Sequence, residues 1–222
     1  MNQELWTAVD EYFVKQLIPS EDVFEAALQA SAAAGLPNIA VSPSEGKFLH
    51  LLAQMHGAKR ILEIGTLGGY SAIWLGRALP ADGILISLEL DPKHAEVARA
   101  NLARAELTAK VSVRVGPALE SLAIMSTEGH APFDFIFIDA DKQNNPGYFE
   151  YALKFSRPGS IILVDNVVRQ GRVIEAESAD SNIQGVRRLM EMVAAEKRVT
   201  ATSLQTVGAK GYDGFMLVMV TG

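Results

Sequence analysis

The chain has 222 residues, 49% of them hydrophobic, and it carries a formal net charge of −6 at pH 7 and no cysteine. This length predicts one domain, residues 1–222, with a full core, and the lack of cysteine excludes disulfides, thiolate metal sites and thiol nucleophiles. An acidic chain without a basic cluster is not expected to bind nucleic acid. With no apolar run of about eighteen residues and no signal-peptide pattern, we expect a cytoplasmic protein that does not bind membranes.

The first 40 residues predict two helices, over residues 3–18 and 21–34, with Pro19-Ser20 between them and Ser20 as the cap of the second. Because they precede the first glycine motif, we expect them to cover it or to form a subunit contact. Ser42-Pro-Ser-Glu45 then has the pattern of a capping box with proline at the first helical position. It predicts a third helix, and its cap region could touch a ligand.

The stretch from Arg60 to Ser71 predicts a buried strand, a glycine turn and a helix. Gly65, Gly68 and Gly69 allow the backbone to bend and to approach a ligand closely, and the free N–H groups at the helix start would face that ligand. The spacing Gly-x-x-Gly-Gly departs from the dinucleotide fingerprint G-x-G-x-x-G, so the turn alone is a weak indication of function.

Two acidic residues near this turn indicate which nucleotide it would bind. Glu63 stands just before the first glycine, where it is unfavourable beside a pyrophosphate but suitable as an acceptor for the ammonium of an amino acid. Glu89 ends the next apolar run, at about the position from which an acid reaches ribose hydroxyls in nucleotide-binding folds. One acid for an amine and one for a ribose describe S-adenosylmethionine better than NAD.

The rest of the chain alternates strands and helices. Asp91-Pro92 caps a helix that runs to Glu106, and two strands pair antiparallel around Gly208 and Gly211. The further segments are strands at 110–115, 133–138, 160–164, 199–206 and 214–221, and helices at 119–125 and 147–155. The pattern predicts an α/β fold: a doubly wound, Rossmann-like, seven-stranded sheet, mostly parallel with an antiparallel C-terminal strand, with helices on both faces and an N-terminal helical extension.

Two of these strands end in carboxylates, at Asp139 and at Asp165 with Asn166 next to it. In an open parallel sheet, ligands bind beyond the carboxyl ends of the strands, so these side chains are expected to converge there, outside the core. Two carboxylates and an amide oxygen form a partial, all-oxygen coordination sphere that suits Mg²⁺, Ca²⁺ or Mn²⁺ and leaves positions for substrate oxygens. Either aspartate alone would be expected merely to begin a loop.

Three motifs in order carry a resemblance to a known family. The runs are Glu63-Ile-Gly-Thr-Leu-Gly-Gly-Tyr-Ser71, Ile138-Asp-Ala-Asp-Lys142 and Val164-Asp-Asn166, the last followed by Gly171-Arg-Val173. Together they resemble the cation-dependent caffeoyl-CoA and catechol O-methyltransferase family over nearly the whole chain. The resemblance implies a class I methyltransferase fold that uses S-adenosylmethionine and a divalent metal, most often Mg²⁺, and that usually forms a homodimer.

The resemblance also implies residue roles. It assigns the metal to Asp139, Asp165 and Asn166 and catalysis to Lys142, and it places the donor against Val41, Glu63, Gly65, Thr66, Ser71, Glu89, Ala118 and Asp141. Ser44 and Glu89 stand where aspartate is usual in the plant enzymes, and both substitutions look tolerable. The loop 167–181 and the N-terminal helices, which choose the acceptor in this family, match nothing assignable, so the acceptor stays open.

Other candidate residues have simpler explanations. The four histidines His50, His56, His94 and His130 lack paired spacing, so none is expected to act as a ligand or base. Arg169 and Arg172 could steer an anionic acceptor, although exposed loop arginines are common.

We therefore expect methyl transfer from S-adenosylmethionine to one oxygen of a catechol-like, vicinal dihydroxy aromatic: a phenol, a flavonoid or a hydroxycinnamoyl ester. The alternatives are an NAD-dependent oxidoreductase on a similar sheet, which Glu63 and the metal set disfavour, and a non-catalytic methyltransferase-like scaffold.

Overall fold

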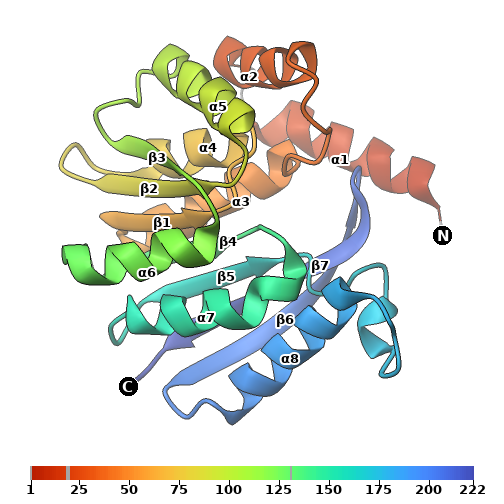
Figure 1. Cartoon of the computed structure of the whole chain (residues 1–222). Coiled ribbons are helices and arrows are strands. Elements are labelled where there is room, and N and C mark those ends of the chain that lie inside the picture. Colours follow the sequence, from red (N-terminus) through yellow and green to blue (C-terminus); the bar gives the residue numbers. More distant parts are fainter. Residues whose placement is uncertain (1, 19–20, 131) are drawn as a thin grey trace.

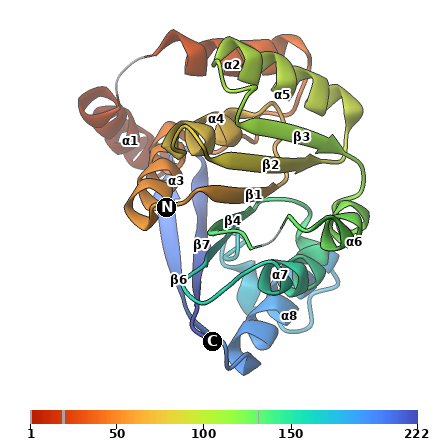
Figure 2. The same cartoon turned by 90° about the vertical axis from the view of Figure 1, so that its left-hand side faces the viewer.

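The structure is a computed structural model that describes residues 2–18, 21–130 and 132–222. Within these residues seven strands form one sheet in the order β3-β2-β1-β4-β5-β7-β6 (Figures 1 and 2). Strands β1 to β5 are parallel, and β7 lies antiparallel between β5 and β6. The strands are β1 Arg60–Ile64, β2 Ile84–Glu89, β3 Val111–Val115, β4 Phe135–Ile138, β5 Ile161–Asp165, β6 Val199–Gly208 and β7 Gly211–Val220.

Helices cover both faces of the sheet (Figure 2). Helices α2 to α5 contribute to the core on one face, and α6 to α8 contribute to the core on the other. The described helices are α1 Gln3–Leu17, α2 Asp22–Ala33, α3 Pro43–His56, α4 Tyr70–Ala78, α5 Pro92–Arg104, α6 Ala118–Glu128, α7 Asn145–Lys154 and α8 Ser181–Ala195, with 3₁₀ turns η1 Lys142–Asn144 and η2 Arg172–Ile174. The predicted fold class is confirmed.

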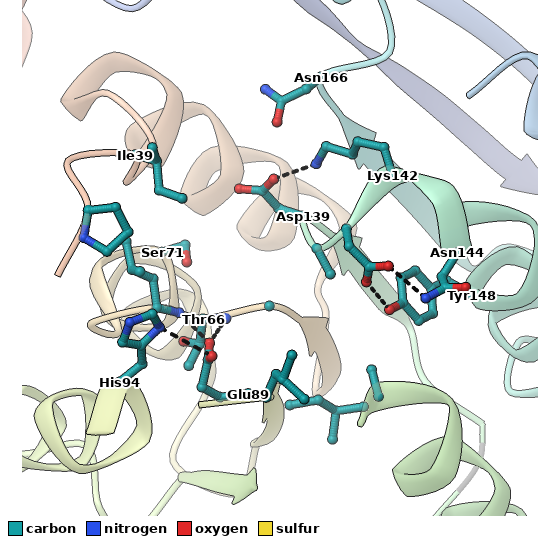
Figure 3. A pocket seen from close by; sticks show the side chains of 18 of the residues that line it. Ile39, Thr66, Ser71, Glu89, His94, Asp139, Lys142, Asn144, Tyr148 and Asn166 are labelled. Carbon is teal, nitrogen blue, oxygen red and sulfur yellow. Dashed lines mark hydrogen bonds and ion pairs between the residues drawn. The ribbon is translucent and has the colours of Figure 1, made fainter. Parts of the chain in front are cut away.

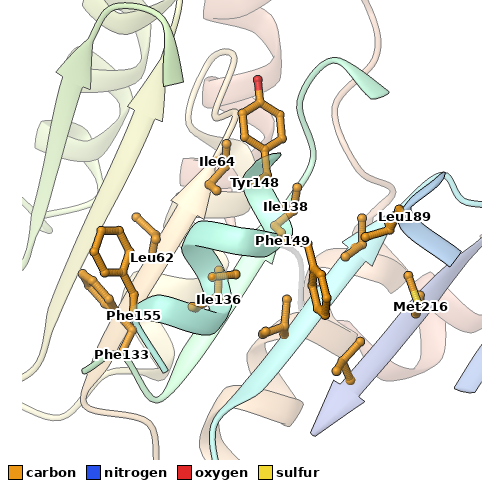
Figure 4. Packing of buried hydrophobic residues seen from close by; sticks show 14 of the residues in the cluster. Leu62, Ile64, Phe133, Ile136, Ile138, Tyr148, Phe149, Phe155, Leu189 and Met216 are labelled. Carbon is orange, nitrogen blue, oxygen red and sulfur yellow. The ribbon is translucent and has the colours of Figure 1, made fainter. Parts of the chain in front are cut away.

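The apolar runs of the central strands bury side chains on both faces of the sheet, as is typical of parallel strands. On the face covered by α6 to α8, Ile64, Ile136 and Ile138 pack with Phe149 of α7 and Leu189 of α8 (Figure 4). Burial of each such side chain contributes roughly 1.5–3 kcal/mol. This packing holds the carboxyl ends of β1, β4 and β5 side by side.

Local sequence signals set the beginnings of several helices. The capping box is present, because the Ser42 hydroxyl accepts a hydrogen bond from the Glu45 N–H and the Glu45 carboxylate accepts one from the Ser42 N–H. Asp91 caps α5 through the N–H groups of Lys93 and His94. The predicted cap at Ser20 lies outside the described residues.

Two helices differ from the sequence-based expectation. Helix α6 runs to Glu128, three residues beyond the predicted end, and stops at Gly129 in a left-handed conformation (φ 73°). Helix α8 was missed, although its buried side chains recur at helical spacing: Ile183, Val186, Leu189 and Val193. Asp180, which caps α8, was the available signal.

The two N-terminal helices lie in different places. Helix α2 packs on the glycine turn, since a Cβ at Gly68 would lie 2.1 Å from the Ser31 hydroxyl. Helix α1 is tied instead to the β6–β7 turn, where the Ala209 N–H donates to Asp10, and it buries none of its side chains. Among the described residues no helix has both the length and the apolarity needed to cross a bilayer.

Candidate active site

The glycine turn after β1 lies directly against the end of β4. Gly65 has φ 92°, and a Cβ there would lie 2.2 Å from the backbone oxygen of Asp139. Only glycine avoids both the unfavourable φ and this contact. The turn therefore brings the donor motif next to the first predicted metal ligand.

Glu63 lies beneath this turn and is fully buried. The Ser87 hydroxyl donates to its Oε2 at 2.5 Å, and its Oε1 has no hydrogen-bond partner among the described residues. Burial raises the pKa of Glu63 to about 7, against the opposing effect of the nearby Ser71, Ser87 and Thr66 hydroxyls. A buried carboxylate oxygen without a donor is suited to accept a cationic ligand group, as the sequence analysis predicts.

Glu89, at the end of β2, holds the glycine turn in place. Its Oε2 accepts the N–H of Leu67 at 2.8 Å and of Thr66 at 3.3 Å, and its Oε1 accepts the Asp91 N–H at 3.0 Å. The His94 ring nitrogen Nδ1 lies 3.4 Å from the same Oε1. With two acceptor positions on each carboxylate oxygen, one position is left on Oε1, beside His94, for a ligand hydroxyl.

One cavity of about 780 Å³ connects the two halves of the site. Figure 3 shows Thr66, Glu89 and His94 at one end, and Asp139, Lys142 and Asn166 at the other. Its lining includes most of the residues predicted for the donor and the acceptor: Val41, Gly65, Thr66, Ser71, Glu89, Ala118, Asp139, Asp141, Lys142 and Asn166. Glu63 and Asp165 are not among its lining residues.

Two predicted metal ligands come from adjacent strands in register. Ile138 of β4 pairs with Val164 of β5, so the residues that follow, Asp139 and Asp165, stand at the same sheet edge. Asp165 is only 5% exposed, which corrects the expectation that it lies outside the core. It is buried because β7 pairs along its other side, through Phe215.

A third acid, Glu45, joins this pair. Burial raises the pKa of Asp165 well above its usual range, and the nearby Asp139 and Glu45 carboxylates add to the shift. Burial and the same Asp139 charge also raise the pKa of Glu45. Three acids therefore lie together at the end of the sheet, which favours a compensating cation.

Lys142 supplies one such cation. Its ammonium lies 2.7 Å from Asp139 Oδ1, and its side chain is 7% exposed (Figure 3). Helix α8 packs tightly on the backbone of this turn, since a Cβ at Gly185 would lie 2.1 Å from the Lys142 carbonyl oxygen. The position of Lys142 thus depends on a helix that the sequence analysis did not identify.

A metal at this end would need Asn166 as well as acids. Among the described residues no group of three His, Cys, Asp or Glu side chains is arranged to hold a metal ion. The donor set of Asp139, Asp165 and Asn166 consists of oxygen ligands only, which suits a hard divalent cation.

Asp141 is fixed by two donors. The Tyr148 hydroxyl donates to its Oδ1, and Asn144 Nδ2 donates to its Oδ2 at 2.6 Å. Burial, with the adjacent carboxylate, raises the pKa of Tyr148, so the phenol stays protonated as a donor. The sequence did not predict a site role for Tyr148, Glu45 or His94. Tyr148 and His94 meet their partners, Asp141 and Glu89, only in the folded chain, and Glu45 is accounted for by the capping box.

Comparisons with known proteins identify the family. A family model described as O-methyltransferase matches residues 19–220. The chain is 50% identical over 220 residues to a catechol O-methyltransferase of Niastella koreensis, covering 99% of this chain and 100% of that protein. It is 49% identical to a catechol O-methyltransferase of Mycobacterium tuberculosis over 212 residues, covering 96% of this chain and 94% of that protein.

Solved structures of O-methyltransferases also resemble this chain, in both fold and sequence. The O-methyltransferase from Bacillus cereus, in complex with SAH, superposes with a TM-score of 0.98 at 58% identity, covering 99% of this chain and 100% of that one. TomG from Streptomyces achromogenes, in complex with SAM, gives 0.97 at 51% identity with 100% of both chains covered. These matches decide against the oxidoreductase alternative, and the chain belongs to the O-methyltransferase family.

Proposed function

We propose that this chain transfers a methyl group from S-adenosylmethionine to one hydroxyl of a catechol-like acceptor with the help of a divalent cation. The observation that carries the proposal is the single cavity that contains both the glycine turn with Glu89 and the Asp139–Lys142 pair. A donor and an acceptor bound at its two ends would share one space. Relatives named catechol O-methyltransferase and structures solved with SAM or SAH support the same choice.

The donor end fits an amino acid joined to a nucleoside. Glu63 has an unpartnered buried oxygen for the ammonium, and the Gly65 turn allows close approach of the ligand. Glu89 and the 39–41 segment would hold the ribose and adenine, with Ser71, Ala118 and Asp141 completing the contact. When bound, S-adenosylmethionine supplies the electrophilic methyl group.

At the acceptor end the chain's own residues bind and orient the hydroxyls. Asp139, Asp165 and Asn166 would hold the cation, which when bound supplies Lewis-acid polarisation of the acceptor oxygens. Lys142 lies beside Asp139 and is positioned to take the proton of the reacting hydroxyl or to stabilise its charge as a fixed cation. Holding the nucleophilic oxygen in line with the methyl group is the main contribution of the cavity.

The test is transfer of a labelled methyl group to a panel of catechols, flavonoids and hydroxycinnamoyl thioesters, with and without Mg²⁺. Metal-dependent labelling of vicinal diols, and not of single phenols, is the expected result. No labelling of any acceptor would leave the scaffold alternative standing, and labelling that persists in chelator would contradict the assigned cation.

We also propose a homodimer. Support comes from α1, whose large apolar side chains are 40–70% exposed: Leu5, Val9, Tyr12, Phe13 and Leu17. Sedimentation equilibrium measures the state directly, and a monomer at micromolar concentration would refute the proposal.

A further inference from the structure

The loop after β5 holds its backbone in unusual conformations. Five non-glycine residues among those described have positive φ, and three of them lie here: Asn166 (56°), Arg169 (54°) and Gln170 (58°). Such conformations persist only where the surroundings enforce them. Asp213 of β7 does so, because its Oδ1 accepts the N–H groups of Val168 at 3.0 Å and Arg169 at 2.8 Å.

The guanidinium of Arg169 is held at the cavity with donors to spare. Arg169 lines the same cavity as Asn166, three residues before it in the chain, and Lys142. Its closest ion pair is long, 3.9 Å from Nη1 to Asp213 Oδ2, and its buried Nε has no hydrogen-bond partner among the described residues. Lys142, by contrast, lies 2.7 Å from Asp139. The terminal Nη groups make no hydrogen bond within the described residues, and the side chain is 33% exposed, so a ligand in the cavity can supply their acceptor.

We propose that Arg169 is a specificity-determining residue. It selects acceptors whose dihydroxylated ring carries an anionic group, specifically a carboxylate. This inference rests on the proposed function. Guanidinium presents N–H donors in a planar fork that matches a carboxylate bidentately, and the backbone held by Asp213 fixes the point from which this side chain extends. The substrate class is therefore a vicinal dihydroxy aromatic acid rather than an uncharged catechol.

The experiment compares protocatechuate with its methyl ester, two acceptors that share the ring and the diol and differ in charge. The wild-type protein is expected to have a kcat/KM at least about tenfold higher for the acid, the size of effect typical of a charged hydrogen bond. Arg169→Met should reduce the acid-to-ester ratio by about tenfold or more. Because the ratio is compared between variants, any intrinsic difference in hydroxyl acidity between the two acceptors cancels.

Arg172→Met is the matched control. Arg172 belongs to the same loop but is exposed and bound by Glu175 and Asp180, so its loss should leave the acid-to-ester ratio unchanged. Arg169→Lys keeps the positive charge without the fork and should give an intermediate ratio. It also carries the test if Arg169→Met does not fold, which thermal melting shows.

Two results would overturn the inference. One is an acid-to-ester ratio that falls as much in Arg172→Met as in Arg169→Met. The other is an Arg169→Met variant that loses activity equally toward both. In either case methylation of the ester still establishes the proposed function, whereas failure to methylate both acceptors refutes that function itself.

Discussion

The two ends of the cavity are organised by opposite means. At the donor end Glu89 accepts three backbone N–H groups and Glu63 accepts the Ser87 hydroxyl, so the acids are held by hydrogen bonds to the chain. At the acceptor end Glu45, Asp139 and Asp165 lie close together, with Lys142 paired to one of them. At the donor end the chain's own N–H and O–H groups hold the acids, whereas the acceptor end gathers three acids and one lysine, as the proposed cation site requires.

The largest expected effect comes from removing that cation. Chelation, or Asp165→Asn, should lower kcat at least about a thousandfold, because Lewis-acid stabilisation is worth several kcal/mol. Measured in chelator, the melting temperature of Asp165→Asn should not lie below that of the wild type, since the substitution removes one of three carboxyl groups that lie close together. Retained turnover, or a variant that does not fold, would refute the metal assignment. Glu96→Ala, an exposed acid on α5, is the control.

The donor end can be tested through Glu63 and pH. Its folded pKa of about 7 lies above the ordinary 4.5, so the folded state binds more protons than the unfolded state between these values. The free energy of unfolding of the ligand-free protein should therefore fall as pH rises from about 4.5 to 7, by about 3 kcal/mol from this group. Denaturant titrations across this range should show a smaller fall for Glu63→Gln. If the free energy of unfolding falls equally with pH in the wild type and in Glu63→Gln, the raised pKa of Glu63 is contradicted.

Lys142 tests the chemistry at the acceptor end. Lys142→Met should lower kcat at least roughly a hundredfold near neutral pH, the usual range for loss of a general base. Lys142→Arg keeps the charge but cannot release its proton, and we expect it to fail too. The defect of the Met variant should narrow as rising pH ionises the acceptor. A Met variant within a few-fold of wild type would exclude a catalytic role, and an active Arg variant would leave only an electrostatic one.

The smallest of these effects concerns Glu89. Glu89→Ala should weaken donor binding by about 1.5–3 kcal/mol, roughly ten- to hundredfold, with little change in acceptor affinity. Part of that loss would come from the glycine turn, because Thr66 and Leu67 lose their acceptor. Calorimetry with the donor measures the change, and an unaltered donor affinity would remove Glu89 from the site.

Much of this molecule follows from local sequence. The capping box at Ser42–Glu45, the cap at Asp91 and the apolar strands are confirmed, because each depends on residues a few positions apart. The order of strands and helices likewise predicts the doubly wound sheet. The glycine turn and the acids at strand ends predict where ligands would bind, since parallel strands place their carboxyl ends on one edge.

The remaining features depend on segments that meet only in the folded chain. Asp165 is buried because β7, about fifty residues later, pairs beside β5, and Glu45 reaches the same acids from the start of α3. Arg169 is held by Asp213 of that later strand, and the turn of Lys142 by Gly185 of α8. Residue type and spacing specify each element's own surface. The burial of a side chain, the clustering of charged groups and the hydrogen-bond partners that a group finds all depend on two surfaces in contact. Only the tertiary structure therefore decides them.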